Sequence, residues 1–532
     1  RREEYAVGLY VDGRDRALDL RHGRRVCLLP ADGSAGEFRI ILSLTSAPAG
    51  GASGKFFSLL VELDTPASIA PEWSHEAVAD VPPPAQLTWS YRRAGTGERA
   101  PFEKVEDGTA GLRRSGVVRL TLPPDWMAEA DLPAGEAYAV WVRAERATYS
   151  SPPVVKQIVP NVVIARHQRQ TDTHELTREW LPLPGNQISL PDLYTEPGGD
   201  SPPLQDHPAL EDSFELSIRE RDGEWHEWTA TNALTFHGPD ERVFVVERET
   251  GMLRFGDGLT GRVPAPGKGI PPENVRLGYR VGGGATGNHG RGLLFEGLTN
   301  SAFKARNVVA AEGGEETESL DRARERAAAA LRRVERAITA SDHEQLLVSA
   351  PGVVATLGVA LSRAHAELGR HPCHPCRRVP GAITIYVVPD APRSEEKDDC
   401  AFVAAPVPDP GALAAARARV ERARLVASEV FVLPAVYREV SLAIHLTGDP
   451  VDAVALREKI TRRMRDFLDP LVGGAEGTGW GFGEPLRPSA LLREAQRAAG
   501  EDASVNWVGI GLDGAPPQEK CLDVRIESHE LV

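Results

Sequence analysis

The stretch from Glu312 to Leu361 constrains the fold more than any other part of this 532-residue chain. Within it, apolar residues recur in steps of three and four, which places them along one side of an α-helix. The opposite side is almost entirely Arg and Glu. We therefore expect an amphipathic helix whose apolar stripe packs inward, formed by Leu320, Ala323, Ala327, Leu331, Val334 and Ile338.

A second, shorter helix is expected to follow from Ser341. Ser341 and Glu344 have the S-x-x-E spacing of a capping box, in which each side chain bonds the backbone N–H of the other residue. Pro351 and Gly352 would end this helix, and the apolar period then changes to two over residues 353–361, which is typical of a strand. The stretch therefore predicts two helices and a strand in succession.

Charge and length limit the class of protein. The chain has 76 acidic and 61 basic residues, and this net charge of −15 argues against nucleic-acid binding because phosphate backbones would be repelled. No run of eighteen apolar residues is present, so we expect no membrane insertion. The length suggests several domains. We place them at residues 1–150, 151–310, 311–410 and 411–532.

The cysteines give an expectation about the compartment. The five of them lie at positions 27, 373, 376, 400 and 521, and this odd, scattered set predicts no disulfide framework. A reducing cytoplasm fits best, so we expect assembly there. Arg1 is not an initiator methionine, and the chain is expected to begin inside a longer gene product.

The first domain is expected to be an antiparallel β-sandwich. Short apolar segments are bounded by Gly, Pro, Asp or Ser clusters, a pattern typical of sandwich strands. Trp89 and Trp141 are interpreted as core aromatics. Residues 152–161 are expected to form an extended linker. The predicted strands cover residues 26–29, 38–42, 57–61, 87–91, 117–122 and 139–143.

The second domain is expected to be β-rich, with a hairpin formed by residues 242–246 and 252–255. The hairpin leads into Gly256-Asp257-Gly258-Leu259-Thr260-Gly261, which matches the G-x-G-x-x-G pattern of dinucleotide sites. Such a site needs a helix immediately afterwards, and Pro264 and Pro266 forbid one. A second glycine segment, residues 279–288, lacks the Lys-Ser/Thr pair of a phosphate loop. Its glycines indicate close backbone approach.

The rear half is expected to be α/β. Apolar periodicity predicts helices around residues 413–427 and 456–467, and strands at 381–388 and 440–446, so that helices cover a small sheet. One loop carries four candidate ligands for tetrahedral Zn²⁺ within six residues. We interpret this loop mainly as a variable connection, because such tightly spaced donors with intervening prolines would struggle to surround one ion. The four donors are His371, Cys373, His374 and Cys376.

These motifs together resemble the baseplate J family of contractile phage tails and related contractile injection systems. The resemblance rests on the Gly-Gly pair and Arg-rich helix of the opening stretch, on both glycine segments and on an aromatic-glycine motif near the C-terminus. It assigns interface or structural roles to Gly256, Gly258, Gly283, Asn288, Gly313, Gly314, Arg322, Arg326, Arg333, Thr339, Asp342, Gly352, Trp480 and Gly483.

The resemblance implies a structural role without cofactor. Members of the family form wedges, in which two related J-type subunits pair and neighbouring wedges close a six-fold ring around the central spike hub. The ring also links to the sheath. The implied partners are therefore a second J-type subunit, neighbouring wedges, and the hub and sheath-linking proteins.

The residues themselves offer only fragments of a catalytic set. His343 and Glu344 begin an H-E-x-x-H zinc pattern, but the fifth position is Leu347. We find no G-x-S-x-G elbow, Walker lysine or calcium loop, and expect no enzymatic activity. Two alternatives remain open at this point. One is a β-rich carbohydrate-binding or adhesin protein, suggested by the sandwich and its tryptophans, and the other is a zinc hydrolase that uses the Cys/His loop.

Overall fold

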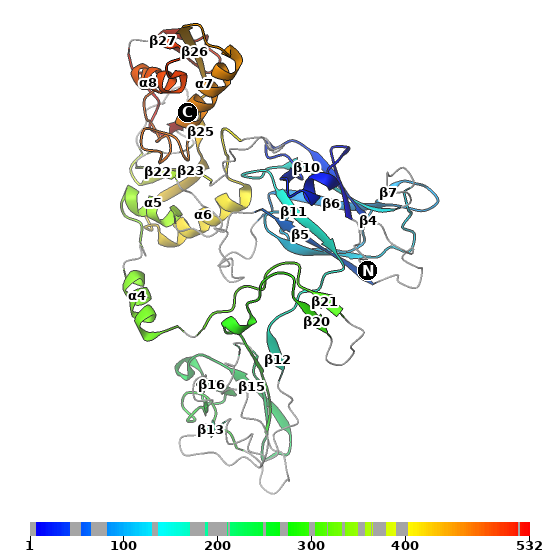
Figure 1. Ribbon diagram of the computed structural model, residues 1–532. Coiled ribbons are helices and arrows are strands. Elements are labelled where there is room, and N and C mark those ends of the chain that lie inside the picture. Colours follow the sequence, from blue (N-terminus) through cyan, green and yellow to red (C-terminus); the bar gives the residue numbers. More distant parts are fainter. Residues whose placement is uncertain are drawn as a thin grey trace. The chain divides into compact units, whose positions relative to one another are not determined.

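The computed structural model describes residues 7–42, 55–64, 82–129, 137–170, 187–189, 210, 213–247, 252–265, 275–296, 304–316, 318–331, 336–348, 357–362, 364, 366, 379–389, 403–519 and 522–532. The chain divides into two compact units. Residues 1–163 and 332–532 form one of them, here called the split unit, and residues 164–331 form the other, the inserted unit. Figure 1 shows their elements in sequence colours.

The front of the split unit is an antiparallel β-sandwich, as the sequence predicts. One sheet has the strand order β2-β1-β4-β10-β6-β7 and the other β3-β11-β5-β9-β8. A short helix, α1 (Ala17–Arg21), follows β2. The strands are β1 (Val7–Val11), β2 (Arg14–Asp15), β3 (Val26–Cys27), β4 (Gly36–Leu42), β5 (Phe56–Leu63), β6 (Ala85–Arg92), β7 (Arg99–Pro101), β8 (Val105–Asp107), β9 (Gly116–Thr121), β10 (Tyr138–Ala147) and β11 (Val154–Pro160).

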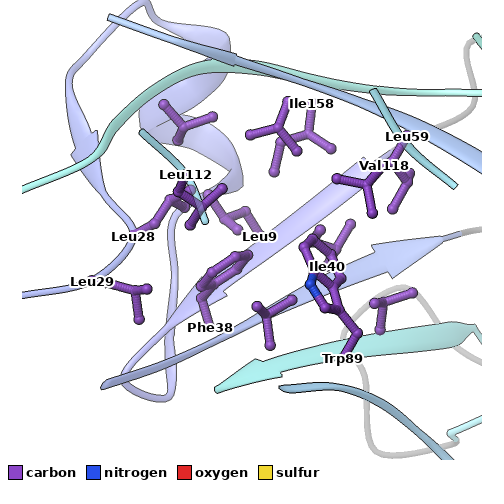
Figure 2. Close-up of a cluster of buried hydrophobic side chains, with 14 of the residues drawn as sticks. Leu9, Leu28, Leu29, Phe38, Ile40, Leu59, Trp89, Leu112, Val118 and Ile158 are labelled. Atoms are coloured by element: carbon purple, nitrogen blue, oxygen red, sulfur yellow. The ribbon is translucent and has the colours of Figure 1, made fainter. Parts of the chain in front are cut away.

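Alternating side chains from both sheets fill the space between them (Figure 2). In β9, Val118 and Leu120 are fully buried while Arg119 between them is exposed. This two-residue period is typical of a strand with one face toward the core and one toward solvent. Trp89 is buried in this core, as expected. The expected linker at 152–161 is instead strand β11, because it pairs with β3 and β5 and buries Val155 and Ile158.

The inserted unit is built on a six-stranded sheet of order β13-β17-β16-β15-β14-β18. The predicted hairpin is present as β16 and β17, which pair antiparallel. Trp228, Phe244, Phe255 and Tyr279 form its buried aromatic core. The elements are β12 (Gln168–Gln170), β13 (Gln187–Ser189), β14 (Glu215–Arg219), β15 (Trp225–Ala230), η2 (Leu234–Phe236), β16 (Val243–Glu247), β17 (Met252–Phe255), β18 (Val275–Gly278), β19 (Arg280–Gly282), η3 (Ala285–Gly287), β20 (Leu294–Glu296), β21 (Lys304–Arg306) and α4 (Leu320–Ala330).

After the inserted unit, the chain returns to the split unit and forms two α/β lobes. In the first, called the rear lobe, α5 and α6 pack on a sheet of order β22-β23-β24. Leu347, Val420 and Val432 share its core with residues of β23. The rear lobe comprises α5 (Ala340–Val348), β22 (Leu357–Ser362), β23 (Ala382–Val388), α6 (Pro410–Ala423) and β24 (Glu429–Pro434).

In the second, the C-terminal lobe, α7 and α8 pack against a sheet of order β26-β27-β28 (Figure 1). The expected fold class is thus confirmed: a β-rich multidomain front followed by α/β lobes. The four domain boundaries stay predictions. The remaining elements are β25 (Val436–Tyr437), β26 (Val440–Thr447), α7 (Ala453–Leu468), α8 (Pro488–Ala499), β27 (Ser504–Leu512), β28 (Gln518–Glu519) and β29 (Glu530–Leu531).

Two further features bear on the sequence interpretation. Of the five cysteines, only Cys27 lies within the described residues, and it forms a disulfide bond that the sequence did not lead us to expect. In the described part of the chain, no helix combines the length and apolar character needed to cross a membrane.

Candidate functional site

Two of the sequence motifs meet in the inserted unit, although 26 residues separate them. The side chain of Asn288 donates to the carbonyl oxygen of Gly314 at 2.7 Å and accepts from its N–H at 2.9 Å. Glu316 adds a third bond by accepting from the N–H of Ala285 at 2.8 Å. The second glycine segment and the Gly313-Gly314 pair therefore form one junction between two chain segments.

Close backbone approach explains the glycines of this junction. A Cβ atom on Gly314 would overlap the carbonyl oxygen of Gly284, and one on Gly282 would overlap that of His167. Gly283 and Gly284 have φ angles of 84° and 69°, which side chains other than glycine rarely adopt. In the described residues, the glycines of the junction therefore serve close backbone approach and turn geometry.

The first glycine segment is a tight turn rather than a nucleotide loop. A Cβ atom on Gly256 would collide with the backbone of Gly261, and Gly258 has a φ angle of 86°. Asp257 accepts hydrogen bonds from the N–H groups of Thr260 and Leu259 at 2.8 and 2.9 Å. These bonds hold the pKa of Asp257 below its usual value. The turn is also tied to a neighbouring segment, because the N–H of Gly261 donates to the carbonyl oxygen of Gly238.

An exposed two-stranded ribbon extends from the junction. Its strands β20 and β21 pair antiparallel, and Asn307 fixes their register by accepting from the N–H of Leu293 at 2.6 Å and donating to the carbonyl of Gly290 at 2.7 Å. Leu294 is 79% exposed and Phe295 47%. A lone two-stranded ribbon is marginally stable in water, so the exposed apolar side chains of β20 favour a contact with another surface.

The Arg-rich helix α4 differs from its prediction. Arg326 forms a two-pronged ion pair with Glu318, both bonds being 2.8 Å, while Leu320 is 68% exposed and Leu331 90%. The expectation that the stripe packs inward is therefore wrong for these two residues and for Ile338, which is 66% exposed. The reason is that alanine dominates the stripe, and Ala323 and Ala327 offer little apolar area to hold a helix on a core. Arg322 is exposed on α4, and Arg333 and Val334 lie outside the described residues.

The predicted capping box of α5 is shifted by two residues. Thr339, not Ser341, begins the helix: its hydroxyl accepts from the N–H of Asp342 at 3.2 Å, and Asp342 accepts from the N–H of Thr339 at 2.7 Å. These backbone bonds lower the pKa of Asp342. Glu344 instead accepts from the N–H of Ala360 in β22 at 3.0 Å. The sequence misled because T-x-x-D and S-x-x-E boxes overlap here, and helix α5 begins at the earlier one.

His343 and Glu344, which begin the incomplete H-E-x-x-H pattern, have structural roles in α5. His343 is fully buried, and its Nδ1 lies 2.7 Å from the carbonyl oxygen of Thr339. The predicted helix end at Gly352 falls outside the described residues, as do His371, Cys373, His374 and Cys376. The zinc interpretation of that loop therefore stays untested.

Trp480 and Gly483 have structural roles in the C-terminal lobe. Trp480 is buried, meets Phe467 edge-to-face at 5.5 Å, and donates through Nε1 to the carbonyl of Glu484 at 3.3 Å. Gly483 has a φ angle of 68° and donates its N–H to the carbonyl of Glu530. Gly483 thus holds the last strand of the chain, whereas Trp480 packs in the hydrophobic core of the lobe.

Sequence reasoning missed the contact that joins the sandwich to the rear lobe. Asp409 caps α6 by accepting from the N–H of Gly411 at 2.8 Å, and the same carboxylate is ion-paired with Arg113 of the sandwich. The N–H of Asp409 donates to the hydroxyl of Ser150 at 3.0 Å. Asp followed by Pro410 is a helix-start signal that could have revealed the cap. No local signal reveals a partner 296 residues away.

Trp141 lies on the outer face of the sandwich, not in the core as expected. Its ring is covered by the guanidinium groups of Arg99 and Arg39, at 3.5 and 4.6 Å from the centroid, and its Nε1 donates to Glu129 at 2.8 Å. These cation–π contacts occupy the ring. A sugar could stack on Trp141 only by displacing a guanidinium, so this tryptophan does not support carbohydrate binding.

One group of potential metal ligands occurs in the described part of the chain, formed by Glu220, Asp222 and His226. The buried Glu220 is already paired with Arg242 at 3.1 Å and with Arg262 at 3.0 Å. Asp222 and His226 bond one another at 2.8 Å. The charges are thus balanced without a cation, and the arrangement is an ordinary ion-pair cluster.

A cavity of about 1200 Å³ lies in the split unit between the sandwich and the segment that leads into α6. Arg14, Arg146 and Arg417 line it together with Asp12 and Asp32. Its lining among the described residues includes these two carboxylates but no histidine. The cavity is a mixed polar and apolar hollow without a recognisable catalytic set.

Comparison with known proteins gives a weak structural likeness. No family model and no curated protein matches the chain. One solved structure, described as "Cryo-EM structure of the anti-feeding prophage (AFP) baseplate, 6-fold symmetrised", is similar over 61% of this chain and 74% of the other, with 12% identity and a TM-score of 0.31. A likeness at that level carries no argument about fold or function.

Proposed function

We propose that this chain is a structural subunit of the baseplate of a contractile injection system or phage tail, and that it acts without catalysis. The observation that carries the proposal is the junction of Asn288 with Gly314. Two segments that resemble baseplate J motifs, separated in sequence, depend on one another for their backbone geometry. Residues used in this way set the shape of a scaffold, as a structural subunit requires.

The modular build supports a role in a large assembly. The chain combines separate hydrophobic cores in the sandwich, the inserted unit and the two α/β lobes. Separate cores allow a chain to contact several neighbours at once and to move by hinges between rigid parts. The exposed ribbon and α4 provide surfaces that the described chain itself does not cover.

The finer role follows from the resemblance. In this proposal the chain is a wedge subunit that pairs with a second J-type subunit. Neighbouring wedges close a six-fold ring around the spike hub, and the ring links to the sheath. The particle assembles in the cytoplasm. Among the described residues, Glu220 and Asp409 are held in ion pairs with arginines, so these two clusters give no support to enzymatic activity over this role.

A tagged pull-down from the native cells, followed by electron microscopy of the eluted particles, tests the proposal. We expect tubes with sheaths that carry a six-fold plate at one end, with the tagged chain at the plate. A matched variant, Asn288→Ala, should reduce incorporation, because it removes both bonds to Gly314, whereas Asn506→Ala in the C-terminal lobe should not. Monodisperse single chains without tube or sheath proteins would refute the proposal.

A further inference from the structure

Charge is distributed unevenly along the chain, and the helices of the C-terminal lobe carry a positive surplus. Residues 453–468, which form α7, hold five basic and two acidic residues, and residues 487–499 around α8 hold three basic and one acidic. The chain as a whole has a net charge of −15. The basic side chains of the two helices are exposed: Arg457, Lys459, Arg462, Arg463, Arg465, Arg487, Arg493 and Arg497.

Residues 453–532 as a whole hold 13 acidic and 10 basic residues, but the described ion pairs involve only some of the cations of the two helices. The buried carboxylate of Glu494 forms ion pairs with Arg463, Arg497 and Arg493, with N···O distances of 2.6, 2.7 and 3.6 Å. One carboxylate therefore faces three guanidinium groups. Four further cations of α7 form no ion pair within the described ranges: Arg457, Lys459, Arg462 and Arg465. These side chains hold a positive field at the surface of the lobe.

A matching acidic segment lies in the inserted unit, immediately before and into α4. Residues 164–331 contain 27 acidic and 18 basic residues. Within residues 312–321 there are five acidic residues and no basic one. Glu312 and Glu315 are exposed and form no ion pair in the part of the chain that is described. The segment is thus the local complement of the α7 and α8 surface.

Exposed apolar side chains lie near both the acidic segment and the basic helices. On the acidic side, Leu320 of α4 and Leu331 immediately after it are 68% and 90% exposed. On the basic side, Val451 and Val454 at the start of α7 are likewise uncovered, Val454 being 69% exposed. Desolvated apolar contacts contribute affinity, whereas surrounding charges select the partner and speed the encounter. An amphipathic helix with an acidic start is the element that such a surface would accept.

We propose that the basic surface of α7 and α8 binds the acidic segment 312–321 and the apolar side of α4 of a second copy of this chain. The two patches differ, so the contact is heterologous and runs head-to-tail, which closes a ring when the rotation per copy is right. The inference deepens the proposed function, on which it rests for its biological setting.

Zero-length carbodiimide crosslinking tests the contact directly, because Lys459 is the one lysine between residues 403 and 519. An equal mixture of ¹⁴N and ¹⁵N full-length chains is crosslinked at low salt and analysed by mass spectrometry. We expect mixed-isotope peptides that join Lys459 to carboxylates of residues 312–321, and their loss at high salt. Exclusively same-isotope links would show an intrachain contact, and links to other carboxylates would show another surface. Either result overturns the proposal.

Charge reversal supplies the second readout. Arg457→Glu, Arg462→Glu and Arg465→Glu together should raise the Kd of self-association, measured by sedimentation velocity, by about tenfold or more. A control with the same change in net charge, Arg21→Glu, Arg114→Glu and Arg146→Glu in the sandwich, should leave it nearly unchanged. Adding Glu312→Arg and Glu315→Arg to the first variant should restore association. Equal loss in both triple variants, or a wild-type chain that stays monomeric at low salt, overturns the proposal.

This result is independent of the pull-down. Baseplate particles without the Lys459 crosslink would leave the proposed function standing and remove this contact. A crosslink without baseplate particles would retain the contact as a self-association surface and remove the proposed function.

Discussion

Helices α4 and α7 are both amphipathic, with apolar residues in steps of three and four and charged outer faces, and they differ in what covers the apolar side. Leu456, Ile460, Met464 and Phe467 of α7 are 4–6% exposed against α8 and the sheet. The two leucines of α4 are 68% and 90% exposed. Periodicity thus indicates where an apolar face lies, whereas the size of its side chains decides whether the chain's own core covers it.

Removing a large side chain from α7 should have the largest effect. Phe467→Ala should lower the free energy of unfolding of the C-terminal lobe by about 3–5 kcal/mol, because it removes buried apolar area and leaves a cavity beneath Trp480. Denaturant titration followed by tryptophan fluorescence measures it. A change below about 1 kcal/mol would mean that α7 contributes little more to its lobe than α4 does.

The next effect should come from the buried carboxylate between α7 and α8. Glu494→Gln should destabilise the lobe by about 1–3 kcal/mol, less than for a fully buried pair, because the partner guanidinium groups can turn to water. Glu318→Gln in α4 is the matched control, where the ion pair is exposed and the change should be hardly measurable. Equal losses at both positions would contradict the difference in burial.

The same carboxylate predicts a pH dependence. Burial alone would raise the pKa of Glu494, but the hydrogen bond and charge of Arg463, with Arg497 and Arg493, outweigh it and lower the pKa. Its contribution to stability is therefore complete above the unfolded-state value of about 4.3 and is lost as the pH falls through the lower folded-state value. Denaturant titrations between about pH 3 and 7 should show this loss in the wild type and a flatter profile in Glu494→Gln.

Removal of the N-terminal cap should destabilise α7 more than α4, by a smaller amount than the changes above. Asp452 accepts from the N–H groups of Val454 and Ala455 at 3.0 and 2.9 Å, whereas Ser319 of α4 accepts one bond, from Arg322, at 3.3 Å. Asp452→Ala should therefore destabilise its lobe by about 1 kcal/mol, and Ser319→Ala by less. Hydrogen exchange of peptides from each helix measures both, and a larger effect at Ser319 would break the comparison.

The smallest effect on folding is expected in α4. Sequence reasoning alone predicts that Leu331→Asp unfolds the rear lobe, but this side chain is 90% exposed, so the free energy of unfolding should change by less than about 0.5 kcal/mol. The control is Val426→Asp, which is also fully exposed and lies far from α4 in sequence. If α4 binds a second copy, Leu331→Asp should weaken self-association while Val426→Asp does not.

The sequence predicts much of the fold because its signals there are local. Six of the sandwich strands, the hairpin of β16 and β17, and helix α7 of the C-terminal lobe follow from apolar periodicity and turn residues; the six strands are β3, β4, β5, β6, β9 and β10. Residues 152–161 were interpreted as a linker because prolines bound the segment, yet two buried side chains make it a strand. Pairing partners, as for β11, depend on the rest of the sheet and leave no mark in the segment itself.

The candidate site was less predictable for the same reason. The glycines of the junction indicate that two backbone segments approach closely, but only the fold shows that these are Gly314 and Gly284. Trp141 was expected in the core because tryptophan is mostly apolar, while the arginines that cover it come from three other strands. Contacts between distant segments decide the role of such residues.

The cap of α6 has a consequence for the order in which the chain matures. Asp409 shares its carboxylate between the start of α6 and Arg113, and 296 residues separate the two partners. At about 5–20 residues per second, a ribosome makes Asp409 roughly 15 to 60 s after Arg113. During that interval a folded sandwich would lack the Asp409 carboxylate beside Arg113, and the surface that the rear lobe later covers would be open to a chaperone or an early partner.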